Sequence, residues 1–492
     1  MGLDSNTPVI VGVGAITQRS DDPRGLLEPL NLMASALERA ARDAGEPGLL
    51  AAADTVWMPR GFWPYSSPGQ LLGERFGAPK IRHIVSEIGV LQTTLLGHAA
   101  AAIASGKSDV ALIVGGEARD REVAFQKQGD TAPITEQVDC PPDETLRPQA
   151  ELIHPIEIEL GLVAPTTQFA LLDHALRASE GQSLGAHRQE IGRLWAEFSR
   201  VAVDNPDAWD RRPLSLEEII SPNKTNRMLS FPYTKSLVSQ WTVNQAGGLI
   251  LCSYARALRL GLDKARFIYP LAVVDSEAML PMSERRELHI SLGFEYAFER
   301  ALSYLDRGVG QIDELELYSC FPAAIRVQQR ALNLDLARVV TQTGGMTFAG
   351  GPLNNFVIQS WVKMVERLRE GTSGSRIGMV TAVSGFMTKQ GVSLLATDPV
   401  EDFLFDNVTD RVRRDQGKIT VDPDLEGTVR VASYTVDHER DGSMRVVLIL
   451  DSEGERRTLR VVDDKELALE AMALDLCGRE LTLESGGRLR WS

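Results

Sequence analysis

Residues 86–117 have the layout of a site for a nucleophile or an anion. A short extended segment ends at Gly89, a helix of small residues is predicted over about Leu91–Ser105, and a strand over Val110–Val114. The N-terminus of such a helix carries unpaired N–H groups and the positive end of the helix dipole, which stabilise a thiolate or a bound anion. Gly89 and Val90 stand there, and neither offers a nucleophile or a base.

The cysteines do not form a metal-binding or disulfide pattern. There are four in the chain, and no two of them make a CxxC pair: Cys140, Cys252, Cys320 and Cys477. Scattered cysteines of this kind are typical of a reducing compartment. We therefore predict no metal site and no disulfide framework, and we expect the protein to be cytoplasmic.

The other polar side chains with catalytic potential have two interpretations each. His98 lies inside the predicted helix, which favours a hydrogen-bonded core histidine over a catalytic one. His154 is a candidate to approach a cavity from a loop. Gly350–Gly351 and Asn354–Asn355 offer backbone and amide donors to an oxyanion or phosphate, or they form a tight turn before a helix.

Composition limits the class of protein. The chain has 492 residues with 43% hydrophobic and 24% charged residues, which predicts two to four globular domains. A net charge of −15 argues against nucleic acid or an anionic membrane surface as the main partner. No apolar run approaches the roughly 18 residues of a membrane span, and we predict neither a span nor a signal peptide.

Two parts of the chain repeat one order of elements. Strands are predicted at Pro8–Gly14, Asp54–Met58, Ile81–Ser86 and Val110–Val114, and again at Phe267–Val274, Glu314–Tyr318 and Ile377–Val383. Helical segments at Leu27–Ala44, Leu91–Ser105, Phe294–Leu305, Phe321–Leu332 and Asn355–Arg369 alternate with them. Alternation predicts mainly parallel sheets covered by helices, and duplication predicts two such sheets packed pseudo-symmetrically.

The rest of the chain divides into three further regions. Residues 120–233 are Pro-rich and polar around helical segments and are predicted to be an inserted loop domain. Charged residues from Val400 to Gly417 predict a linker. From residue 418 to residue 492, short alternating strands, a hairpin turn at Asp441–Gly442 and one helix at Lys465–Ala473 predict a small closed antiparallel barrel of the oligonucleotide/oligosaccharide-binding type.

The duplicated half and the insertion resemble the thiolase superfamily over residues 7–400. The segment FPYTKSLVSQWTVNQAGGLILCS at 231–253 is similar to thiolases of the sterol carrier protein-x type. The final 75 or so residues resemble the extra barrel of the mycobacterial thiolase-like proteins of type 1. The resemblance implies an α/β fold of five layers, αβαβα, divided into an N-terminal half at 1–119 and 234–270 and a C-terminal half at 271–399.

Thiolase chemistry, as the resemblance implies it, needs four groups. A cysteine at the N-terminus of the first-half helix takes the acyl group, a histidine activates it, a second cysteine moves the α-proton, and an Asn or His helps form an oxyanion hole. Aligned on the surviving motifs, these positions hold Gly89, Gly351 of GGMTFAGGP, Val383 before Ser384–Gly385, and Tyr318 of YSCF. All four reactive groups are replaced.

The replaced positions move the search for chemistry to their neighbours. Tyr318 is the candidate acid/base or oxyanion donor, or a space-filling side chain at a strand end. Cys320 is a displaced nucleophile or, as we favour, a small buried hydrophobe. The remaining candidates for the pocket wall are Val90, Phe321, Gly350, Ser384 and Gly385. His174, Arg177, Arg188 and Arg193 form a basic patch for the nucleotide of coenzyme A, or solvated helix faces.

Three functions follow from the resemblance. The first is a protein of lipid metabolism that binds coenzyme A or acyl-CoA, holds no covalent cofactor, and lacks the acetyl-CoA acyltransferase activity of the family. The second is a retro-aldol enzyme that cleaves a β-hydroxyacyl-CoA, such as a steroid side chain, with Tyr318 as acid/base. The third is a non-catalytic scaffold for an active thiolase-fold partner. The protein is expected to be a monomer or a weak homodimer.

Overall fold

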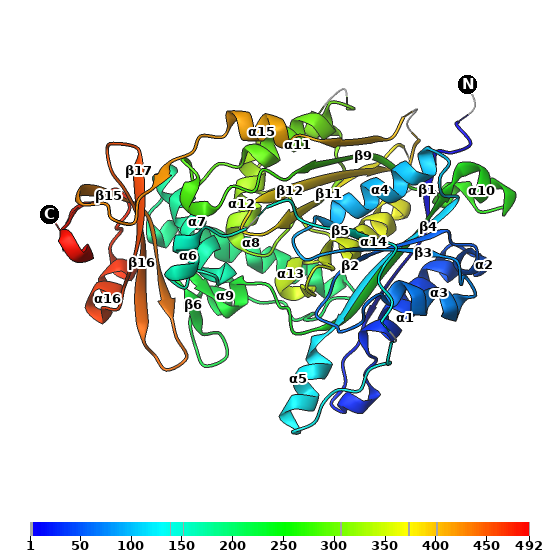
Figure 1. Cartoon of the computed structure of the whole chain (residues 1–492), viewed down its shortest axis with the longest axis horizontal. Coiled ribbons are helices and arrows are strands. Elements are labelled where there is room, and N and C mark those ends of the chain that lie inside the picture. Colours follow the sequence, from blue (N-terminus) through cyan, green and yellow to red (C-terminus); the bar gives the residue numbers. More distant parts are fainter. Residues whose placement is uncertain are drawn as a thin grey trace.

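Two mixed β-sheets, one from each half of the chain, form the centre of this computed structural model (Figure 1). The structure describes residues 3–137, 139–150, 152–305, 308–371, 374–399 and 402–491. The first sheet has the order β1 (Pro8–Thr17), β8 (Asn244–Ser253), β4 (Val110–Ala118), β2 (Thr55–Pro59), β3 (Arg82–Ser86), β5 (Glu144–Leu146). The second has the order β10 (Glu314–Glu316), β11 (Ile377–Ser384), β12 (Lys389–Ala396), β9 (Tyr269–Ser276), β13 (Leu404–Asn407).

The two sheets share one pairing scheme, which confirms the predicted duplication. In the first sheet β1 and β4 both pair antiparallel with β8, and β4 pairs parallel with β2. In the second, β9 and β11 both pair antiparallel with β12, and β11 pairs parallel with β10. The runs β1-β8-β4-β2 and β9-β12-β11-β10 are therefore equivalent in order and direction.

Helices complete the five layers. α4 (Gln92–Ala104) and α14 (Phe356–Glu370) lie between the sheets, and each also contacts the sheet of the other half, α4 against β9 and α14 against β8. α1 (Pro29–Asp43) covers the outer face of the first sheet, and α11 (Leu292–Leu302) covers that of the second. The duplicated thiolase-like α/β fold predicted from the sequence is confirmed.

The small residues of α4 explain its central position. Ala99 and Ala100 are fully buried, and a side chain on Gly97 would collide with the Phe405 ring. Such small side chains let a helix approach neighbouring backbones closely, so that two sheets can pack on it at once. The apolar residues of α4 and α14 and of the inner sheet faces form one core cluster.

The insertion carries five further helices. They are α5 (Arg119–Lys127), α6 (Pro155–Glu159), α7 (Pro165–Ser179), α8 (Leu184–Asp204) and α9 (Leu216–Ile220). Its three short strands join larger sheets: β5 extends the edge of the first sheet beside β3, whereas β6 (Met228–Ser230) and β7 (Tyr233–Thr234) attach to the C-terminal sheet. Strands of two or three residues are too short to show an alternating pattern, so the sequence did not reveal these connections.

The segment predicted as a linker contains regular structure. Within residues 402–417, β13 pairs parallel with β9 at the edge of the second sheet, and α15 (Thr409–Asp415) packs beside α11. Residues 400 and 401 lie outside the described residues. Charged side chains can be accommodated in β13 and α15 because an edge strand and a surface helix each leave one side open to solvent.

The C-terminal residues form a strand-rich region at one end of the molecule, where the C-terminus lies far from the N-terminus (Figure 1). Its sheet has the order β14 (Thr420–Val421), β17 (Arg456–Val462), β16 (Met444–Asp451), β15 (Gly427–His438), β18 (Glu480–Leu483), β19 (Leu489–Trp491), with β6 beside β15. The predicted helix is present as α16 (Lys465–Ala473), which packs on β16. Closure of this sheet into a barrel stays a prediction.

The other helices are short connections around these layers: α2 (Gly48–Ala51), α3 (Pro68–Phe76), α10 (Tyr254–Arg259), α12 (Pro322–Ala331) and α13 (Gly345–Phe348). Within the described ranges no helix is long and apolar enough to cross a lipid bilayer.

Candidate functional site

A cavity of about 710 Å³ lies at the N-terminus of α4. Both halves of the fold and the insertion contribute to its wall, which is mostly apolar. Its apolar side chains are Phe62, Ile88, Leu152, Pro165, Phe169, Leu229, Val238, Trp241, Phe321, Met346, Pro352, Leu353, Val383 and Phe386. A volume of several hundred Å³ and a mainly apolar wall are typical of sites for small organic ligands.

The structure brings together the four positions that the sequence comparison aligned with the reactive groups of thiolases. Gly89, Tyr318, Gly351 and Val383 all line this cavity, although up to 294 positions separate them in the sequence. Four of the other six predicted wall residues join them: Cys320, Phe321, Ser384 and Gly385. The other two, Val90 and Gly350, do not line it.

Gly89 presents only backbone at the mouth of α4. Its φ of +104° is a conformation that L-residues rarely adopt, while a Cβ there would meet Pro148 at an ordinary 3.4 Å. The buried ammonium of Lys389 donates a hydrogen bond to the Gly89 carbonyl oxygen. The backbone conformation, rather than lack of space, therefore favours glycine at position 89.

Gly351, which the sequence comparison aligned with the thiolase histidine, lies in a crowded place where a side chain would press on its neighbours. A Cβ would lie 3.0 Å from the Met346 methyl carbon and 3.3 Å from the Ser239 Cβ. The neighbouring segment is fixed by hydrogen bonds from the Gly351 N–H to the Gln240 carbonyl oxygen (2.8 Å) and from the Gln240 N–H to the Met346 carbonyl oxygen (3.0 Å). Met346 and Ser239 thus fill the space beside this position.

Tyr318 and Cys320 are the only titratable side chains among the described residues that line the cavity. Burial raises the pKa of Tyr318 far above its ordinary value, and burial also strongly raises the pKa of Cys320. Both groups are protonated at neutral pH. Cys320 is therefore no thiolate nucleophile, and Tyr318 can donate a proton or hydrogen bond but cannot serve as a base.

The Tyr318 backbone is held firmly at the end of β10. Its N–H donates to the Thr381 hydroxyl oxygen at 2.7 Å, and its carbonyl oxygen accepts from the Gln328 amide at 3.0 Å. The ring packs edge-on against Phe356, with ring centroids 6.0 Å apart. Within the described residues, no hydrogen-bond partner of the Tyr318 hydroxyl is found, so this hydroxyl is available to a ligand.

A pair of amides adds polar groups that the sequence reasoning underused. Gln92, in the first turn of α4, donates through Nε2 to the Asn354 Oδ1 atom, and both residues line the cavity. Asn354 was considered as an oxyanion donor, but Gln92 was missed. The signal for Gln92 was its place at the first residue of the helix, close after Gly89 in the sequence.

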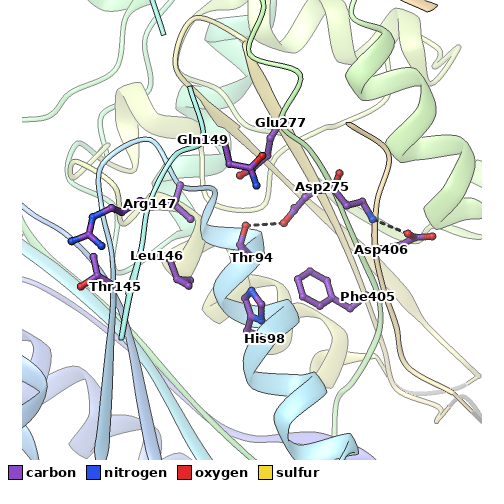
Figure 2. A pocket seen from close by; sticks show the side chains of 12 residues that line it. Thr94, His98, Thr145, Leu146, Arg147, Gln149, Asp275, Glu277, Phe405 and Asp406 are labelled. Carbon is purple, nitrogen blue, oxygen red and sulfur yellow. Dashed lines mark hydrogen bonds between the residues drawn. The ribbon is translucent and has the colours of Figure 1, made fainter. Parts of the chain in front are cut away.

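A second cavity, of about 570 Å³, lies along another flank of α4 (Figure 2). Val90, Thr94 and His98 contribute one helical face, and Asp275 accepts a 2.7 Å hydrogen bond from the Thr94 hydroxyl. Burial lowers the pKa of His98, whose ring stacks on Trp57. His98 lies outside the first cavity and is only partly buried, and no hydrogen bond to its ring is found among the described residues, so the expected hydrogen-bonded core histidine is not supported.

The remaining predicted groups are used elsewhere. His154 caps α6 by accepting from the Ile156 N–H at 3.2 Å. The predicted basic patch is wrong: His174 and Arg177 are buried, and Arg177 forms an ion pair with Asp475 at 2.6 Å. The amphipathic pattern had suggested solvent-facing helices, whereas the C-terminal region covers this part of α7. No group of three metal-ligating side chains is found in the described ranges.

Solved structures with the fold of this chain support its place in the thiolase superfamily. The chain is similar to a monomeric SCP2-thiolase-like protein type 1 from Mycobacterium smegmatis, with 25% identity and a TM-score of 0.82. The similarity covers 99% of this chain and 98% of that one. The chain belongs to the thiolase superfamily. No family model and no curated protein matches its sequence.

Two other members of this superfamily fold match the thiolase part. The Ltp2–ChsH2(DUF35) aldolase structure is 17% identical, with a TM-score of 0.59, over 80% of this chain and 99% of the matched one. Human mitochondrial 3-ketoacyl-CoA thiolase in complex with CoA is 16% identical, with a TM-score of 0.53, over 80% and 98%. At these identities the likeness shows the fold alone.

Proposed function

We propose that this thiolase-superfamily member binds a long-chain acyl-CoA in the first cavity and has no thiolase activity. One observation carries the proposal: the four family positions converge on a single apolar cavity and hold Gly89, Tyr318, Gly351 and Val383. Apolar surface removed from water contributes roughly 25 cal/mol per Å², so an acyl chain gains affinity there without any covalent step. The CoA complex of the human thiolase supports CoA as the carrier.

The test compares palmitoyl-CoA with free CoA by isothermal titration calorimetry. We expect palmitoyl-CoA to bind at least roughly tenfold more tightly, since its chain enters the apolar cavity. Leu229→Trp places a larger side chain in the wall and should abolish this difference. Leu258→Trp is the matched control, because Leu258 is 39% exposed on α10 and does not line the cavity.

Two results would contradict the proposal. Equal affinities for CoA and palmitoyl-CoA would show that the cavity does not bind the acyl chain. Thiolysis of acetoacetyl-CoA, together with an acyl adduct on Cys320 detected by mass spectrometry, would restore covalent catalysis.

A retro-aldol activity is the second candidate, and the free Tyr318 hydroxyl favours it. In the cleavage of a β-hydroxyacyl-CoA the bond between the α- and β-carbons breaks and an enolate of the shorter acyl-CoA forms. A protonated Tyr318 can donate to that enolate, while the proton of the β-hydroxyl must leave to another acceptor. The aldolase among the similar structures supports this fold as a host for such chemistry.

Tyr318→Phe tests this candidate. The loss of one acid catalyst should reduce cleavage of a 3-hydroxyacyl-CoA by roughly 10²–10⁴-fold, measured as aldehyde or ketone release. An unchanged rate would exclude Tyr318, and no cleavage by the wild type would exclude the activity. A scaffold role remains a prediction that no described contact favours.

A further inference from the structure

Two segments of the insertion lie between the first cavity and the C-terminal region. On α7, Thr166 and Phe169 line the cavity, and on β6 Leu229 lines it. Both elements contact β15 of the C-terminal sheet, α7 by packing on this strand and β6 by pairing with it (Figure 1). This part of the cavity wall is therefore one layer, with the cavity on one side and the C-terminal region on the other.

The side chains of the two segments divide between these sides. On α7, Thr167 and His174 are seven residues apart and so share the helix face that meets β15, where the His174 ring packs on Tyr434 with ring centroids 4.6 Å apart. On β6, Ser230 follows Leu229, and neighbouring side chains of a strand point to opposite faces. Each segment thus presents one side chain to the cavity and its neighbour to the C-terminal region.

One carboxylate of β15 joins both segments. The Asp437 Oδ1 atom accepts from the Ser230 hydroxyl at 2.6 Å and from the Thr167 hydroxyl at 2.8 Å. The Oδ2 atom accepts from the Arg445 guanidinium at 3.1 and 3.2 Å. Asp437, Thr167 and Ser230 are all less than 5% exposed. Hydrogen bonds to an ionised acceptor are stronger than those between neutral groups, and burial protects these from water.

We propose that Asp437 is a positioning residue for the first cavity, which holds the two wall segments in the arrangement that receives the acyl chain. The inference rests on the proposed acyl-CoA binding and assigns a part in it to the C-terminal region. Asp437 is not among the described residues that line the cavity, so it acts only through its neighbours. A wall that is ordered before the ligand arrives loses less conformational freedom on binding, and this raises affinity.

Other contacts keep the C-terminal region docked when Asp437 is changed. The Ser433 hydroxyl donates to the Leu171 carbonyl oxygen at 2.6 Å, and the Thr435 hydroxyl donates to the Phe231 carbonyl oxygen at 2.8 Å. Both bonds join β15 to backbone next to the wall segments. Loss of the Asp437 acceptor should therefore loosen the wall locally rather than detach the region.

The first test replaces Asp437 and measures dissociation constants of palmitoyl-CoA and free CoA by calorimetry. Asp437→Leu has a side chain of similar size that accepts no hydrogen bond. Its affinity for palmitoyl-CoA should fall roughly tenfold, while that for free CoA changes less than about twofold. Asp437→Asn should keep most of the preference, because hydroxyls can pair with either the oxygen or the NH₂ group of an amide.

A second variant covers the case in which Asp437→Leu does not fold. Thr167→Val combined with Ser230→Ala removes both donors and leaves the Asp437–Arg445 ion pair in place, so the same fall in affinity is expected. Thr341→Val is the matched control. Thr341 is fully buried and donates to the buried Glu316 carboxylate at 3.0 Å, but it does not line the cavity. It should leave the affinity ratio unchanged.

Amide hydrogen exchange of the free protein tests the positioning without any ligand. In the double variant, amides of residues 166–171 and 228–231 should exchange roughly tenfold faster than in the wild type, because their segments open locally more often. Amides of β15 should keep their protection. A general loss of stability would instead speed exchange throughout the C-terminal sheet.

The outcomes separate this inference from the proposed function. An unchanged affinity ratio in the double variant, or unchanged exchange of the wall segments, would overturn the inference and leave acyl-CoA binding in place. An equal fall in the ratio for Thr341→Val would also overturn it. Equal affinities of the wild type for CoA and palmitoyl-CoA would reject the proposed function itself, and hydrogen exchange would then decide alone whether Asp437 holds the wall.

Discussion

The two cavities on α4 differ most in charge. The first, at the N-terminus of the helix, has no Asp, Glu, Lys, Arg or His among the described residues of its wall. The second, on a flank of the same helix, has Asp275, Glu277, Asp406, Arg147 and His98 (Figure 2). The wall of the cavity at the N-terminus of α4, where the helix dipole favours an anion, thus has no acidic or basic side chain among its described residues.

Contacts to neighbouring elements explain why the charges remain on the flank. The Asp275 carboxylate accepts from the Thr93 and Thr94 hydroxyls and ties α4 to β9. One residue joins the two regions: Lys389, whose buried ammonium donates to the Gly89 carbonyl oxygen and lies 4.0 Å from the Glu277 carboxylate. Through Lys389, the charged second cavity is connected to the backbone at Gly89, which lines the apolar first cavity. Substitutions in either cavity therefore test this connection.

Removing the link should have the largest effect. Lys389→Met takes away the only side-chain donor described for the Gly89 carbonyl and the ammonium that pairs with the Glu277 carboxylate. Loss of a buried ionic partner leaves uncompensated polar groups, and the free energy of unfolding should fall by roughly 3 kcal/mol. Urea denaturation at pH 7.5 measures this change.

Lys107→Met serves as the control for the same substitution at an exposed position just after α4. It should change the stability by less than about 0.5 kcal/mol. An equally small change in the free energy of unfolding for Lys389→Met would show that the contacts of Lys389 do not couple the two cavities.

A smaller effect is expected from Asp275, and its sign depends on pH. Burial raises the pKa of Asp275 to about 7, although the hydroxyls of Thr93 and Thr94 oppose this change. Below about pH 4 the group is protonated in both the folded and unfolded states and costs nothing. Above about pH 7 it is ionised in both, so the folded state loses stability as the pH rises between these values.

Asp275→Asn removes this titration. The free energy of unfolding of the variant should equal that of the wild type near pH 4.5. Near pH 8.5 it should be higher by roughly 2 kcal/mol, as measured by thermal unfolding across that range. The pKa values of Glu316 and Glu117 are also raised by burial, to about 7 and about 8, so part of the slope will remain. If the difference in unfolding free energy between Asp275→Asn and the wild type became smaller with rising pH, the raised pKa of Asp275 would be contradicted.

The same comparison indicates what the sequence could predict. The strand and helix order and the duplication followed from period and motifs, because those features are local in the chain. The meeting of Gly89, Tyr318, Gly351 and Val383 was expected only from the resemblance to the thiolase superfamily. Gln92 and Asn354 are separated by 262 positions, so their contact depends on tertiary packing that no local pattern encodes.

Edges and interfaces between regions were the weakest part of the prediction. Both alternatives considered for His174 and Arg177, a basic patch and solvated helix faces, placed them in solvent, whereas they are buried, because a helix alone does not reveal what covers its second face. Likewise, Leu404–Asn407 was placed in a linker, although it adds an edge strand to the second sheet. In each case the partner is a segment far away in the chain, and the deciding free energy comes from tertiary contact rather than local propensity.

The smallest expected effect concerns the backbone at the mouth of the first cavity. Gly89→Ala introduces a Cβ that meets Pro148 only at contact distance, so the cost arises from the φ of +104° and should be roughly 1–2 kcal/mol of unfolding free energy. Gly185→Ala in α8 is the control of opposite sign, since alanine favours a helix and nothing lies within 4 Å of the added carbon. If Gly89→Ala were neutral, a cysteine would be tolerated there as well, and the conformation of this residue would no longer explain its replacement.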